Sequence, residues 1–83
     1  MHEFGLARDI IRRALREVEE GRGARVEALH IIMGPDHYVD REALALGIGA
    51  AARGTLAEGA TVRFTEGSGG GLVLESIQIV EVE

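Results

Sequence analysis

The chain has 83 residues, 46% of them hydrophobic, and a formal net charge of −5 at pH 7. This length allows one small domain of modest stability, because a chain this short buries only roughly 60–65% of its unfolded surface. The absence of cysteine excludes disulfides, thiolate metal sites and thiol nucleophiles. All nine basic residues are Arg and alternate with acids, which argues against nucleic-acid binding. No membrane span or secretory signal is recognisable, so we expect a cytoplasmic protein.

The first part of the chain predicts a helix followed by a strand. Apolar residues at helical spacing indicate an amphipathic helix over about residues 4–20, ended by Gly21-Arg22-Gly23. The residues expected on its inner face are Phe4, Ala7, Ile10, Ile11, Ala14, Leu15 and Val18. Residues 25–33 then predict a strand with Leu29, Ile31 and Met33 on one face.

A second helix is predicted over about residues 41–53, with Asp40 as its N-cap. Gly47 and Gly49 each weaken this helix by roughly 1 kcal/mol relative to Ala, so we expect them to permit close packing on the sheet. The run Gly47-Ile48-Gly49 resembles a dinucleotide-binding fingerprint but lies inside a helix, where that motif has no function.

Two further strands are predicted, over residues 61–65 and 72–82, separated by the glycine-rich loop 67–71. We expect these two strands to pair as an antiparallel hairpin. The element order is α-β-α-β-β. The predicted fold is therefore α+β, a two-layer sandwich of a small three-stranded sheet with two helices on one face.

The first three residues, Met1-His2-Glu3, form the main candidate site. The α-amine of Met1, the imidazole and backbone amide of His2, and the carboxylate or amide of Glu3 make a compact nitrogen-rich ligand set. A square-planar or tetragonal set of this kind suits Ni(II) or Cu(II) better than Zn(II). The simpler interpretation is that His2 and Glu3 only begin the first helix, with Glu3 complementing its dipole.

The chain has two other histidines. His37 follows Pro35-Asp36 in a loop before Asp40 and is a candidate additional metal ligand, although most loop histidines are only solvated. His30 is expected on the strand face opposite Leu29, which should meet water, and a metal role there is not favoured. No nucleophile–base pair or cofactor motif stands out, so the sequence does not predict an enzyme.

Several motifs resemble the HypA family of nickel metallochaperones, which act in [NiFe]-hydrogenase maturation and, in some bacteria, in urease maturation. The similar residues are Met1-His2-Glu3, Met33-Gly34, residues 39–44, residues 53–60 and, at the end, residues 75–79. The resemblance implies a Ni(II) carrier whose partner is a maturation GTPase or a nickel-enzyme precursor.

This chain also differs from the family in one large respect. Members of the family carry a zinc domain with two Cys-x-x-Cys pairs between their last two strands, whereas this chain has only the loop 67–71 there. We therefore expect residues 1–83 to form a single nickel-binding-type domain without structural zinc. The alternative is a metal-independent interaction module that has lost nickel delivery. It would self-associate through strand exchange, an open sheet edge or the face that carries Ile32.

Overall fold

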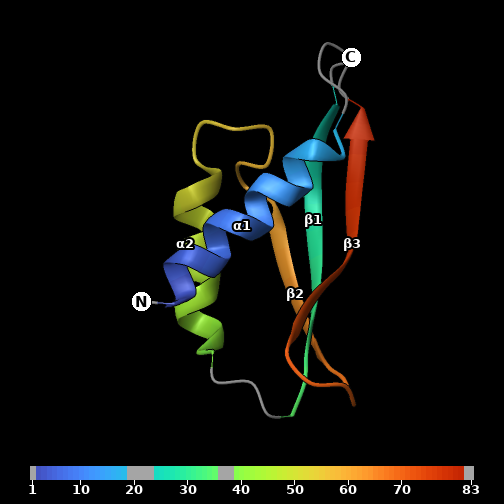
Figure 1. Ribbon diagram of the computed structural model, residues 1–83. Helices are drawn as coiled ribbons and strands as arrows, with labels where there is room; N and C mark the ends of the chain where they lie inside the picture. The colour runs from blue at the N-terminus through green and yellow to red at the C-terminus, as the bar shows by residue number, and fades with distance from the viewer. Residues whose placement is uncertain (1, 19–23, 36–38, 82–83) are drawn as a thin grey trace.

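The computed structural model describes residues 2–18, 24–35 and 39–81 (Figure 1). Two helices and three strands follow one another in the predicted order. They are α1 (His2–Arg16), β1 (Ala24–Met33), α2 (Arg41–Ala52), β2 (Thr61–Glu66) and β3 (Leu72–Glu81). Neither helix in these ranges is long and apolar enough to cross a membrane.

The sheet has β1 at its centre, in the order β2-β1-β3. β1 pairs with β2 in parallel, with Leu29 opposite Val62, and with β3 antiparallel, with Leu29 opposite Ile77. The predicted hairpin between the last two strands is therefore wrong. β2 takes the position reached by a crossover through α2, and β3 pairs on the other side of β1.

The connection between β2 and β3 passes over the end of β1. The Gly67 amide donates to the Met33 carbonyl at 2.9 Å, and the Gly34 amide donates to the Gly71 carbonyl at 2.7 Å. A Cβ on Gly34 would collide with the backbone oxygen of Gly69. Glycine at position 34 is thus what allows the connection to cross so closely.

Both helices pack on one face of the sheet and enclose a single core (Figure 1). As predicted, Leu29, Ile31 and Met33 share the inner face of β1, and all three are fully buried. Val26 is buried as well, although it lies three residues before Leu29. A register irregularity between Val26 and Ala28 shifts the alternation and returns both apolar side chains to the core.

The first helix departs from the prediction at both ends. Phe4, expected on the inner face, is 64% exposed, and one edge of its ring lies near Gly47 of α2. The α-helix ends at Arg16, and the next two amides bond three residues back, with Glu17 donating to Ala14 and Val18 to Leu15. The predicted end at residues 21–23 lies outside the described residues.

Candidate functional site

The N-terminal motif begins α1 and lies beside the start of α2. His2 is the first residue of the helix, and Glu3 is the acidic residue of its first turn. The Asp40 amide donates to Oε2 of Glu3 at 3.5 Å, a long hydrogen bond between segments 37 residues apart. Met1, the side chain of His2 and all of His37 lie outside the described residues.

Asp40 is the N-cap of α2, as predicted. Its Oδ1 accepts from the amides of Glu42 at 2.9 Å and Ala43 at 3.2 Å. Because its backbone meets Glu3, this cap also brings a second carboxylate into the neighbourhood of the N-terminal motif. The sequence predicts only a capping role for Asp40, because no local pattern indicates a contact with Glu3, 37 residues earlier in the chain.

The first residue of α2, Arg41, contacts β2. The guanidinium of Arg41 lies 5.7 Å from the centre of the Phe64 ring and 3.9 Å from the Glu66 carboxylate, both on β2. The ion pair is exposed and contributes little, and the cation–π contact with Phe64 adds about 0.5–1 kcal/mol at an exposed site. The helix itself is anchored by Leu44 and Ile48, which are buried in the core.

Gly47 allows the first turn of α1 to approach α2. A Cβ at Gly47 would lie 3.1 Å from the Cβ of Ala7, 3.4 Å from a ring carbon of Phe4 and 3.6 Å from the Glu3 carbonyl oxygen. The expected close packing therefore occurs, but against the other helix and not against the sheet. A Cβ on Gly49 would meet nothing within 4 Å, so the prediction is wrong for that residue.

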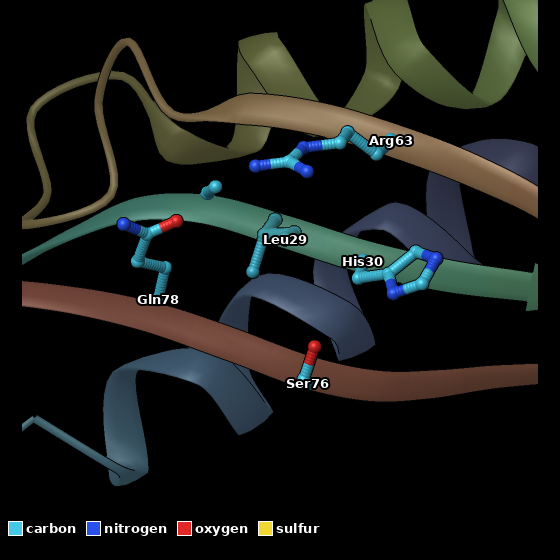
Figure 2. Close-up of a pocket in the computed structure, with 6 residues that line it drawn as sticks. Leu29, His30, Arg63, Ser76 and Gln78 are labelled. Atoms are coloured by element: carbon cyan, nitrogen blue, oxygen red, sulfur yellow. The ribbon is translucent and has the colours of Figure 1, made fainter.

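His30 lies on the helix-free face of the sheet, as expected (Figure 2). Its Nε2 is 2.6 Å from the Thr65 hydroxyl on β2, and its Nδ1 is 3.0 Å from the Glu75 carboxylate on β3. Both ring nitrogens are thus engaged across the three strands. This arrangement favours a structural role for His30 over metal binding.

A shallow hollow of about 180 Å³ lies beside His30 on this face. Figure 2 shows Arg63 from β2 and Ser76 and Gln78 from β3 around it. Ile32, which is expected to be exposed on the same face, is instead half-buried, and its side chain lies against Gly67. Among the described residues, no three His, Asp or Glu side chains converge as a metal site, on this face or elsewhere.

Comparison with known proteins places the N-terminal motif in a family context. The family model described as "Hydrogenase/urease nickel incorporation, metallochaperone, hypA" matches residues 1–71, which include Met1-His2-Glu3 and exclude β3. A hydrogenase maturation factor HypA from Chlorobaculum tepidum is 35% identical over 71 residues, 86% of this chain and 63% of that protein. HypA proteins from Pyrococcus horikoshii and Pyrococcus furiosus are 32% and 33% identical over 66 residues.

The chain spans less than two thirds of the length of these relatives, and 48% of the length of the Pyrococcus proteins. The similarity to the last strand that was expected from residues 75–79 lies beyond the matched residues 1–71. The match covers the other residues on which the resemblance rests, from Met1 to residue 60. The chain therefore belongs to the HypA family of hydrogenase and urease nickel-incorporation metallochaperones.

Proposed function

We propose that this chain binds one Ni(II) ion through Met1-His2-Glu3 and delivers it to a maturation partner. The partner is a GTPase or a nickel-enzyme precursor of the [NiFe]-hydrogenase type, and the chain's own role is not catalytic. The observation that carries the proposal is the family match, which begins at residue 1 and so includes the whole motif.

The ligand chemistry supports nickel as the cargo. The Met1 amine, the His2 amide and the His2 imidazole form fused chelate rings around one ion, and borderline divalent ions favour such nitrogen sets. Glu3 adds its backbone amide or its carboxylate, which the described structure places beside the Asp40 amide. Because the ligands must lose protons to bind, we expect affinity for Ni(II) to fall as the pH drops below neutrality.

We further propose that residues 1–83 act as one nickel-binding-type domain, with the loop 67–71 in the place of the family's zinc domain. The loop is short and hydrogen-bonded at both ends to the end of β1. These 83 residues contain no cysteine, so they supply no thiolate ligand for a zinc site of the Cys-x-x-Cys kind.

The test is a calorimetric titration of the tag-free chain with Ni(II). We expect one-to-one binding that is lost in His2→Ala and in a variant with one extra residue before Met1. His30→Gln is the matched control, because it removes a histidine whose ring already bonds Thr65 and Glu75. Unchanged affinity in both N-terminal variants would reject the site.

His37 is tested separately with His37→Ala. If His37 adds a ligand to the ion already held by the N-terminal motif, the variant keeps the one-to-one ratio and binds Ni(II) several-fold more weakly. The visible spectrum of the bound ion should change at the same time, because the number of ligands changes. An identical affinity and spectrum would remove His37 from the site.

A further inference from the structure

The outer face of α2, formed by Glu42, Leu46, Gly49, Ala50 and Arg53, is apolar at its centre and charged at its ends. All five residues are exposed, and Leu46 is 74% exposed. Between residues 43 and 52 the helix has no polar side chain at all. A helix that is hydrophobic all round is normally covered on every side. In Figure 1, no described element lies over the side of α2 that faces away from α1 and the sheet.

The pattern along this face is complementary to itself. When two copies of one helix pack antiparallel about a two-fold axis, each residue lies opposite a residue of the other copy, and the two residue numbers add up to the same total for every such pair. An axis midway between residues 47 and 48 places Glu42 opposite Arg53 of the second copy. The same axis places Leu46 opposite Gly49 of the second copy, so the charge match and the shape match share one register.

The shape match joins a projecting side chain to an open position. Leu46 stands out from the surface, and the space beside Gly49 is open, since a Cβ there would meet nothing within 4 Å. A large side chain on one helix over a glycine on the other lets the two backbones approach closely. Each copy supplies one Leu46 and one Gly49, so the contact is made twice.

Among the described residues, the charges of Glu42 and Arg53 are not matched within one chain. Glu42 and Arg53 are eleven residues apart, about 16 Å along the helix axis, and cannot reach each other. Neither side chain forms an ion pair within the described ranges of the chain. Opposite charges at the two helix ends also suit the helix dipole. The dipole, however, gives no reason for the exposed Leu46 and the uninterrupted apolar run between the charges.

We propose that two copies of this chain associate through the outer faces of their α2 helices, packed antiparallel with Glu42 against Arg53 and Leu46 against Gly49. One short helix from each copy buries less than the roughly 1,200 Å² at the lower end of stable complexes. The dimer is therefore weak and depends on concentration. This association does not depend on nickel or on residues 1–3.

The experiment is sedimentation equilibrium of the metal-free chain from about 10 μM to about 1 mM, a range set by the weak affinity expected of a small interface. We expect a monomer–dimer equilibrium for the unsubstituted chain. Glu42→Arg and Arg53→Glu should each weaken the dimer at least about tenfold, because every substitution acts twice across the two-fold axis. The double variant, carrying both changes, should restore association.

Two further variants separate docking from folding. Gly49→Leu favours the helix and fills an empty position, so the chain stays folded by circular dichroism while the site for Leu46 is blocked. Leu46→Glu removes the projecting side chain from an exposed position. Both should give monomers. Glu17→Arg and Arg16→Glu, exposed charge changes on and just after α1, are the controls and should leave the dimer unchanged.

Either of two results would overturn the proposal. A monomer at every concentration would assign the outer face of α2 to a different protein or to solvent. A dimer that survives Gly49→Leu and does not respond to the charge variants would place self-association elsewhere, for example at the open edge of β3.

Discussion

Gly47 and Gly49 are two residues apart in α2, yet adding a side chain should have different effects on stability at the two positions. We expect Gly49→Ala to raise the free energy of unfolding by roughly 1 kcal/mol, because it adds helix propensity in open space. Gly47→Ala adds the same propensity but places a methyl group 3.1 Å from the Cβ of Ala7, so it should give no gain or a loss. Urea unfolding measures both. Equal gains would show that α1 does not pack at Gly47.

Gly34 is required by the connection that crosses β1. We expect Gly34→Ala to lower the free energy of unfolding by about 1–3 kcal/mol, because the new methyl group meets the backbone of Gly69 and the connection must move away. Gly5→Ala in α1 is the control, since a Cβ there would meet nothing. An unchanged urea midpoint for Gly34→Ala would contradict the crossing.

At the scale of the element, α2 depends on its cap. Asp40→Ala removes the acceptor of the Glu42 and Ala43 amides and should cost about 0.5–2 kcal/mol of stability. Asp40→Asn retains an acceptor and should cost much less. Thermal unfolding of the two variants in the absence of metal measures the difference. Equal losses would mean that the carboxylate acts through its charge and not through the cap hydrogen bonds.

The elements themselves could be predicted from the sequence because each leaves a local pattern. The strand 25–33 alternates from Leu29 to Met33, and the helix 41–53 has a recognisable N-cap at Asp40. The pairing of the strands could not be predicted this way, since a five-residue connection serves either a hairpin or a short step across a neighbouring strand. The prediction for Phe4 is wrong because helical spacing does not indicate where a helix extends beyond the core.

The candidate site was predictable only in part, for the same reason. Met1-His2-Glu3 is recognisable from its chemistry alone, and the family match covers it. The contact between Glu3 and the Asp40 amide joins residues far apart in sequence. It depends on how closely α1 approaches α2, which Gly47 controls, and no local signal contains that information.

At the scale of the whole molecule, one core serves both helices and the sheet. Leu29, fully buried at the centre of β1, should cost about 2–5 kcal/mol when changed to Ala. A domain of this size has a total stability of only about 4–12 kcal/mol, so the variant should lose a large share of it and unfold at a clearly lower urea concentration. Val73→Ala, on the open face and 51% exposed, is the matched control. An unchanged urea midpoint for Leu29→Ala would contradict a single shared core.

The way the chain steps from β2 to β3 gives this fold a natural point of attachment. Its two ends, Gly67 and Gly71, are hydrogen-bonded to Met33 and Gly34 at the end of the central strand. A folded unit grafted between them would leave and re-enter the scaffold at two fixed points, one on each side of that strand. Lengthening such a connection destabilises the fold only slightly, because the entropic cost of closing a loop grows with the logarithm of its length. An additional domain could thus be inserted at this connection without any change in how the three strands pair.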